Sequence, residues 1–115
     1  MRLVNWNIER NGPQTRKAVS LLDEIRALSP DLICLTEAWE TSLDTMGGDV
    51  LTARGVAWSR QAEDERKVVL WSPRPWTNVD RMEPVSAFGG AVSGRTQIDG
   101  CAVRIAGICI PYHMA

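Results

Sequence analysis

The stretch Pro30-Asp31-Leu32-Ile33-Cys34-Leu35-Thr36-Glu37 decides the fold. Its centre, residues 32–35, is apolar at every position, as expected of a short β-strand covered on both faces in a layered α/β domain. Pro30 disfavours helical backbone in the residue before it, so a preceding helix is expected to end at Ser29. The sequence thus places the carboxylate of Glu37 just past the end of a buried strand.

A strand and a helix are predicted before this stretch. Residues 3–8 alternate with the period of two that is typical of a strand, which puts Asn5 and Asn7 on one face. Asn11-Gly12-Pro13 predicts a turn or cap followed by a proline suited to the first turn of a helix. The helical spacing then runs through Ala18, Leu21, Leu22, Ile25 and Leu28. Strand, helix and strand form the expected opening unit.

The chain beyond residue 40 is expected to be mostly strands. Residues 41–55 are polar and contain glycine, which predicts a loop or a short irregular helix. Strands are predicted at residues 56–59 and 67–72, the second stopped by Pro73 and Pro75, and shorter ones at 85–88 and 91–93. Asp99-Gly100 favours a tight hairpin between residues 95–98 and 101–110. One helix and many strands indicate a sheet-rich α/β or α+β domain with too few helices to cover its sheet faces.

Bulk composition excludes few functions. The 115 residues carry a net charge of −1, which provides no general attraction for nucleic acid. Basic residues at Arg60, Arg66, Lys67 and Arg74 are potential phosphate contacts, but the acidic run at 63–65 lies among them, so a mixed solvated surface is predicted there. The alternating N-terminus is unlike a secretory signal, and no apolar run is long enough to cross a bilayer.

The three cysteines, Cys34, Cys101 and Cys109, lie in apolar runs and lack the Cys-x-x-Cys spacing of metal or redox motifs. We interpret them as small buried hydrophobic residues, which suits a reducing cytoplasm.

Several segments, in chain order, resemble the N-terminal half of the endonuclease/exonuclease/phosphatase family. They are Leu3 to Ile8, the helix, Pro30 to Glu37, Val68 to Ser72, Gly94-Arg95 and Gly107 to Pro111. The resemblance implies a partial two-sheet α/β sandwich of the DNase I-like type, with residues 1–115 a truncated part of the domain. Members of that family are metal-dependent phosphoesterases that include apurinic endonucleases, nucleases of the DNase I type, inositol polyphosphate phosphatases and sphingomyelinases.

The resemblance implies roles for three residues. Asn7 is similar to the family's first-strand asparagine, which helps to bind metal and phosphate, and Glu37 to its metal-binding glutamate. Arg95 resembles a substrate-binding arginine of the family, although packing or a surface salt bridge explains it equally well. Magnesium fits these oxygen ligands, with manganese as the alternative, and would polarise a phosphate ester and activate a bound water.

The family's later motifs, an Asp and Asn segment that orients water and an Asp-His pair, are not in this sequence. His113 is the only histidine and lacks the motif, so it is given no catalytic role. Cysteine and Tyr112 replace the family pattern around Pro111. The chain alone is therefore expected to hydrolyse little or nothing.

Each functional interpretation has a structural alternative. Asn7 alone would be a polar residue bonding a turn, and Glu37 alone a solvated carboxylate. Asp31 is expected to begin the strand and not to bind metal. Of the five tryptophans, Trp6 and Trp71 are expected to be buried, and only Trp39 is a candidate for substrate contact.

We therefore expect a magnesium-dependent phosphoesterase that acts on a phosphate-ester substrate, with nucleic acid one candidate. Two alternatives stay open. The first is a non-catalytic binding or assembly module whose exposed sheet is covered by a partner chain. The second is the product of a truncated reading frame with no function of its own.

Overall fold

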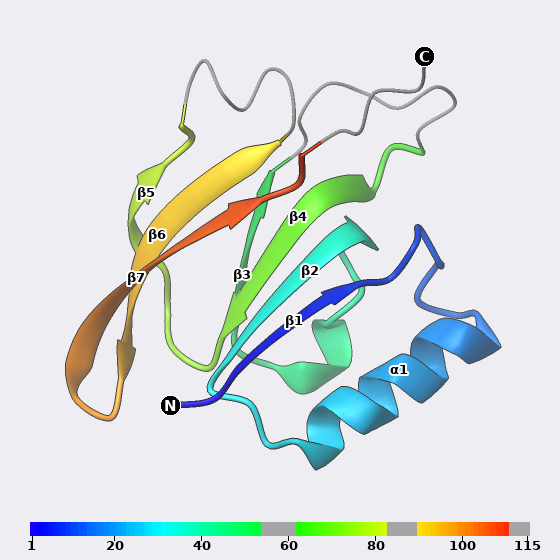
Figure 1. Ribbon diagram of the computed structural model, residues 1–115, viewed down its shortest axis with the longest axis horizontal. Coiled ribbons are helices and arrows are strands. Elements are labelled where there is room, and N and C mark those ends of the chain that lie inside the picture. Colours follow the sequence, from blue (N-terminus) through cyan, green and yellow to red (C-terminus); the bar gives the residue numbers. More distant parts are fainter. Residues whose placement is uncertain (54–61, 83–89, 111–115) are drawn as a thin grey trace.

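The computed structural model describes residues 1–53, 62–82 and 90–110. Along the chain the elements are β1 (Leu3–Asn7), α1 (Arg16–Ala27), β2 (Leu32–Trp39), the 3-10 helix η1 (Asp44–Met46), β3 (Asp49–Ala53), β4 (Glu65–Ser72), β5 (Thr77–Asp80), β6 (Ala91–Ile98) and β7 (Cys101–Ile108). The first sheet has the order β1-β2-β4-β3 and the second the order β5-β6-β7. Figure 1 shows α1 on one side of the first sheet and the second sheet on the other.

The predicted opening unit is confirmed. β1 and β2 are parallel, with Asn7 opposite Thr36, and α1 connects them. β4 lies antiparallel to both β2 and β3, so it is an inner strand of the first sheet. Its whole length is buried, and it ends at Ser72 before Pro73, as predicted. The amphipathic helix and the two-sided strand together give the α/β sandwich its first layers.

The start of α1 differs from the prediction. The helix begins at Arg16, and its N-cap is Thr15, whose Oγ1 accepts a hydrogen bond from the backbone N–H of Ala18 at 3.2 Å. Asn11 belongs to the preceding loop and donates from Nδ2 to the Ile8 carbonyl at 2.7 Å. A threonine hydroxyl is a strong N-cap, and it prevails over the Asn-Gly-Pro signal. The helix ends before Pro30, as expected, with Ser29 at φ 47°.

Two apolar clusters cover the two faces of the first sheet. The cluster under α1 contains Ile25, Ile33, Leu35, Val69 and Trp71 among its buried members. The cluster between the sheets contains Leu51, Ala53, Val68, Leu70 and Val92. The prediction that β2 is covered on both faces is thus confirmed.

Two glycines permit the close approach of the sheets. A Cβ at Gly107 would lie 2.5 Å from Val68 Cγ1, and one at Gly94 would lie 2.8 Å from Leu51 Cδ2. Both distances are far below van der Waals contact, so β6 and β7 pack against the first sheet only because these positions lack side chains.

Two points of the predicted secondary structure need correction. Residues 41–55 contain η1 and the strand β3, because apolar Leu51 and Ala53 pack between the sheets. β5 was not predicted; its residues are exposed throughout, so it lacks the hydrophobic alternation of a half-buried strand. The strands predicted at 56–59 and 85–88, with Arg60, lie outside the described residues.

The hairpin centred on Asp99-Gly100 is confirmed. β6 and β7 pair over their full lengths from Ile98 opposite Cys101, and Asp99 and Gly100 have φ values of 50° and 78°. Positive φ at both central residues is what a type I′ turn requires.

The predicted burial of cysteines and tryptophans is only partly confirmed. Cys101 is exposed, whereas Cys34 and Cys109 are partly buried. Cys101 begins an outer strand and faces away from both clusters. Its apolar neighbours in the sequence therefore did not indicate burial. Trp71 is buried and Trp6 half-buried. In the described ranges, no helix has the length and apolarity that crossing a membrane requires.

Candidate functional site at the ends of β1 and β2

The backbone brings the ends of β1 and β2 to the same edge of the first sheet. The Ile8 N–H donates to the Thr36 carbonyl at 3.1 Å, and the Arg10 N–H donates to the Glu37 carbonyl at 2.7 Å. These bonds extend the parallel pairing past the last residue of β1, Asn7. Asn7 and Glu37, predicted as site residues, therefore lie on neighbouring strands at the same edge of the sheet.

The backbone at this edge adopts an uncommon conformation. Glu9, Arg10 and Glu37 have φ values of 53°, 62° and 50°. Residues other than glycine rarely adopt positive φ, and each such residue costs on the order of 1 kcal/mol or more. Such strain gathers at functional sites, where the surrounding structure holds it. Its presence both in the turn after β1 and within β2 is the strongest backbone evidence for a site here.

The unusual conformation of Glu37 changes which way β2 presents its side chains. Ile33 and Leu35 belong to the cluster under α1, and strict alternation would add Glu37 to that cluster. Instead the fully buried Ala38 joins it. The charge of Glu37 also raises the pKa of the Cys109 thiol, and Cys109 packs on the cluster between the sheets. We infer that the positive φ of Glu37 directs its carboxylate toward the second sheet.

Asn7 faces a cavity between the sheets. Its Oδ1 accepts the Glu9 N–H at 2.8 Å, which leaves the second lone pair of that oxygen and both Nδ2 hydrogens available. The cavity has a volume of about 500 Å³. Its lining includes Asn5, Asn7 and Thr36 from the first sheet and Gly107 and Cys109 from the β7 side. An open, partly polar space thus adjoins the amide of Asn7.

Buried charges lie beside this edge. Arg10 binds Glu65 through two contacts, Nε to Oε2 at 2.7 Å and Nη2 to Oε1 at 3.2 Å. The bond with Glu65, assisted by the charge of Glu37, raises the pKa of Arg10 above its ordinary value. Arg66 contacts Glu40 at 2.7 Å, and Lys67 is only 3% exposed. The prediction of a mixed solvated surface is therefore wrong for residues 65–67, which β4 carries into the interior; Arg74 is exposed.

The two thiols near the site are poor nucleophiles. Burial, together with a smaller effect of the neighbouring Cys109, raises the pKa of Cys34 to about 11. Burial also raises the pKa of Cys109, with a smaller opposing effect from Lys67. Both thiols are protonated near neutral pH, so the polar groups available for chemistry at this edge are the amide of Asn7 and the carboxylates.

Other predicted residues lie elsewhere. Arg95 is exposed on the outer face of β6, because its neighbours Gly94 and Thr96 are the ones that face the first sheet. The structure does not bring Arg95 to Asn7. The Oδ2 of Asp31 accepts the Arg2 N–H at 2.6 Å at the other end of β2. His113 and Tyr112 lie outside the described residues.

The donor set at the edge fits a hard divalent cation. Among described residues, no hydrogen bond occupies the carboxylate of Glu37, and Asn7 retains a free lone pair. Glu9 supplies another carboxylate, held by the Lys17 ammonium at 3.2 Å. The described ranges contain no group of three His, Cys, Asp or Glu side chains that would hold a metal unaided. One or two oxygen ligands supplemented by water are typical of magnesium, not of a structural zinc site.

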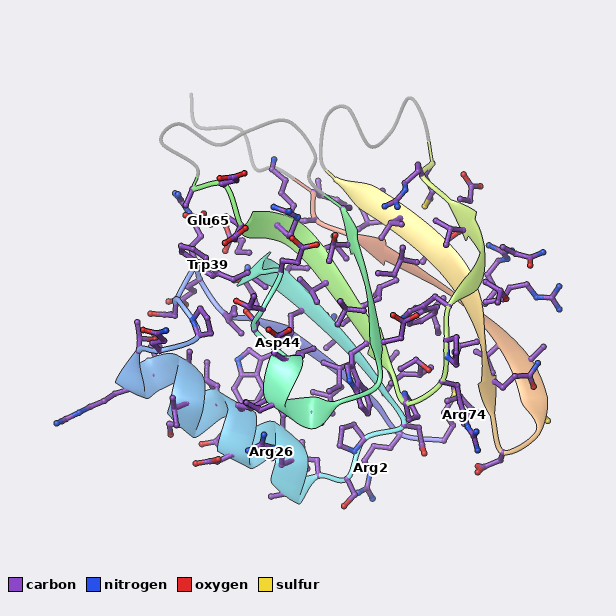
Figure 2. The ribbon with its side chains drawn as sticks, turned by 180° about the vertical axis from the view of Figure 1, so that it is seen from behind. Arg2, Arg26, Trp39, Asp44, Glu65 and Arg74 are labelled. Carbon is purple, nitrogen blue, oxygen red and sulfur yellow. The ribbon has the colours of Figure 1, made fainter. Side chains whose placement is uncertain are left out.

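Several residues of this edge were not predicted from sequence. Glu9, Arg10 and Glu65 are ordinary charged residues in the sequence, and their burial or strain depends on pairing between strands far apart in the chain. Trp39 was singled out, and its indole Nε1 donates to the Arg10 carbonyl at 3.1 Å. Figure 2 shows Trp39 and Glu65 at the same end of the first sheet, above the N-terminal end of α1.

Comparison with solved structures supports the fold. The chain is similar to a humanized D. rerio TDP2 carrying 14 mutations, with a TM-score of 0.63 and 9% identity over 90% of this chain and 47% of that one. It is also similar to sphingomyelinase C from Streptomyces griseocarneus, with a TM-score of 0.54 and 13% identity over 92% of this chain and 47% of that one. No protein-family model matches the sequence, and no curated protein matches it.

These likenesses establish the class of fold. The chain is a partial two-sheet α/β sandwich of the DNase I-like type. It spans about half the length of the two solved structures.

Proposed function

We propose that the chain supplies part of the active site of a divalent-metal-dependent phosphoesterase, with Asn7 and Glu37 as ligands of magnesium or manganese. The observation that carries this proposal is that Asn7 and Glu37 come from adjacent strand ends, with strained backbone at Glu37 and a partly polar cavity beside Asn7. The fold neighbours support the reaction class, since one is named a sphingomyelinase and both share the sandwich.

Each residue of this edge has a separate role in the proposed binding of a phosphate ester. Glu37 anchors the cation, which when bound polarises the phosphate and lowers the pKa of a coordinated water. The Asn7 amide oxygen adds a ligand, or its Nδ2 donates to a phosphate oxygen. Arg10, fixed by Glu65, holds the backbone of Glu37 and adds positive potential.

We propose that the chain corresponds to the N-terminal half of a longer catalytic domain. The 47% coverage of each fold neighbour supports this. A general base and a second phosphate-stabilising group are expected from the remaining half, so this chain alone should show no turnover.

Hydrolysis of bis(4-nitrophenyl) phosphate tests the function. The protein encoded by the complete reading frame should require Mg²⁺ or Mn²⁺, and Asn7→Ala and Glu37→Ala should each reduce kcat/KM by about 100-fold or more. Arg95→Ala, on the outer face of β6, is the matched control and should leave the rate within about twofold. Full activity in both site variants would overturn the assignment.

The alternative of an assembly module predicts different behaviour. Under it the chain would self-associate or capture a partner through its sheets, and Asn7→Ala would affect neither. Sedimentation of the purified chain as a stable monomer with a single cooperative melt would leave this alternative without support.

A further inference from the structure

A second cavity lies at the end of the sandwich opposite the proposed metal site. Its volume is about 690 Å³, within the range of roughly 300–1,000 Å³ that is typical of small-molecule sites. Asp31 lines it and precedes β2, whereas Glu37 lies near the other end of that strand, about 20 Å further along it. Figure 2 shows Arg74, another lining residue, at the end of the molecule away from Trp39 and Glu65. The cavity is therefore separate from the proposed metal site.

The connection between β4 and β5 forms one wall of this cavity, and buried hydroxyl groups hold its backbone. The Arg74 N–H donates to Ser72 Oγ at 3.1 Å, and the Arg74 carbonyl accepts the hydroxyl of Thr96 at 3.2 Å. The two hydroxyl oxygens are 2.6 Å apart, and both residues are buried. Pro73 and Pro75, on either side, have φ fixed by their rings. The backbone of Arg74 is thus held in place without any ligand.

The side chain of Arg74 is available to a ligand. Its guanidinium makes no hydrogen bond or ion pair with any residue that the structure describes. Thr77 and Gln97 line the same cavity and add a hydroxyl and an amide. A guanidinium presents its N–H donors in a planar fork that matches the two oxygens of a carboxylate. This part of the lining favours a ligand with a carboxylate.

Two carboxylates line the cavity as well. The Oδ2 of Asp31 accepts the Arg2 N–H at 2.6 Å, which leaves Oδ1 available, and Asp99 belongs to the turn between β6 and β7. Within the described ranges, neither carboxylate forms an ion pair with Arg74, although all three side chains line one cavity. Opposite charges that are held apart in this way attract a ligand whose own charges pair with both.

The remaining lining selects the rest of the ligand. Pro73, Pro75 and Ile98 provide apolar surface. A simple anion would be repelled by Asp31 and Asp99, and a simple cation by the guanidinium. The cavity therefore favours a molecule that combines a carboxylate, an ammonium group and an apolar side chain.

We propose that this cavity binds a small zwitterion with an apolar side chain, the chemistry shared by a hydrophobic amino acid and a hydrophobic dipeptide. The ligand carboxylate pairs with Arg74, and its ammonium group with Asp31 and Asp99. The ligand thereby joins the start of β2, the connection between β4 and β5, and the β6–β7 hairpin. This binding site goes beyond the proposed hydrolysis and does not depend on it.

The test is a ¹⁵N-resolved NMR titration of the purified chain with L-leucine and with L-leucyl-L-leucine, which differ in the separation of their charges. One or both should shift the amide signals of residues 74, 77 and 97–100 and leave those of residues 7–10 unchanged. The tighter of the two identifies the source of the zwitterion. No shift of the cavity signals by either compound would overturn the proposal.

Modified ligands test the two charges separately. The N-acetylated form of the bound zwitterion lacks the ammonium group, and its C-terminal amide lacks the carboxylate. Each should bind roughly tenfold more weakly than the zwitterion, because each loses a charge-assisted hydrogen bond. Equal affinity of all three forms would show that the charges of the lining do not select the ligand and would overturn the proposal.

Variants of the lining complete the test. Arg74→Gln keeps the backbone bonds to Ser72 and Thr96, and should weaken the zwitterion by roughly tenfold while leaving the amidated ligand unchanged. Asp31→Asn/Asp99→Asn should likewise weaken the zwitterion but not the acetylated ligand, and asparagine suits the turn before Gly100.

Arg16→Gln, at the exposed start of α1, is the matched control and should bind the zwitterion as the original chain does. Unchanged affinity in Arg74→Gln or in the double variant would overturn the proposal, as would an equal loss in Arg16→Gln.

Discussion

Two of the regions in which residues adopt positive φ do so for different reasons. At the β6–β7 hairpin, Asp99 and Gly100 adopt it because a tight turn demands it, and the residue types suit that demand. At the ends of β1 and β2, Glu9, Arg10 and Glu37 adopt it although glutamate and arginine have no preference for it. The first region satisfies the geometry of a tight turn, whereas the second stores backbone strain beside the proposed site.

The largest expected difference between these regions concerns the packing beneath them. Leu35 lies two residues before Glu37 and is 2% exposed, so Leu35→Ala should lower the free energy of unfolding by about 3 kcal/mol through the lost apolar contacts and the cavity left. Val103 is half-buried in the mostly exposed hairpin strand β7, and Val103→Ala should cost less than about 1 kcal/mol. Urea denaturation of the two variants checks this. Equal losses of unfolding free energy in the two variants would show that the packing beneath the edge contributes no more to stability than the packing of the hairpin.

The next effect concerns the charge that holds the edge. Arg10→Ala leaves the 6%-exposed Glu65 carboxylate without its bidentate partner. Breaking a fully buried pair costs about 3–5 kcal/mol, and because Arg10 is 37% exposed we expect about 2 kcal/mol. Lys17→Ala removes the exposed pair with Glu9 and should change stability by less than about 0.5 kcal/mol. Thermal melts in 0.5 M salt separate the two, because screening weakens only the exposed pair.

A smaller effect on stability tests the backbone strain at Glu37 separately from its carboxylate. Glu37→Gly and Glu37→Ala both remove the carboxylate, but only glycine adopts positive φ without a steric penalty. Glu37→Gly should therefore be more stable than Glu37→Ala by about 1 kcal/mol. In the hairpin, Gly100→Ala should be destabilising by a similar amount, since Gly100 has φ 78°. Equal stability of the two Glu37 variants in denaturant titration would show that the backbone at Glu37 is unstrained.

The subtlest contrast lies in the cysteines of the two regions. Cys101 is exposed at the start of the hairpin strand and should react first with a thiol reagent at pH 8, and Cys34 last. Burial raises the pKa of Cys34 from 9.0 to about 11, so its thiolate forms only as the pH approaches that value. Because the unfolded chain releases this proton first, stability should fall as the pH rises from 9 to 11. Cys34→Ala should make stability less dependent on pH over this range. An unchanged dependence would show that a group other than the Cys34 thiol titrates there.

The sequence predicted the scaffold better than the environment of the site. Period-two alternation located β1, a two-sided apolar run located β2, and Asp99-Gly100 located the hairpin, because these signals are local. β3 and β5 escaped prediction, since one lies in a polar segment and the other is exposed throughout. The start of α1 was misplaced because two capping signals stood close together in the loop.

Asn7 and Glu37 were chosen by resemblance, and the parallel pairing of β1 and β2 places their backbones at the same edge of the first sheet. The strain at Glu37 and the buried pair between Arg10 and Glu65 could not be predicted, because they depend on contacts across 55 residues of chain. The charged run at 63–67 shows the same limit. Runs of charged residues usually face solvent, but here the inner strand β4 holds Glu65, Arg66 and Lys67 in buried positions.

Paramagnetic broadening by Mn²⁺ tests the central claim most directly. In a ¹⁵N-resolved spectrum of the purified chain, substoichiometric Mn²⁺ should broaden the amide signals of residues 7–10 and 36–38 first and leave Arg95 sharp. Glu37→Ala should abolish that pattern, and excess Mg²⁺ should reverse it. Broadening that spares both strand ends, or that persists unchanged in Glu37→Ala, would contradict the assignment of a metal site to this edge.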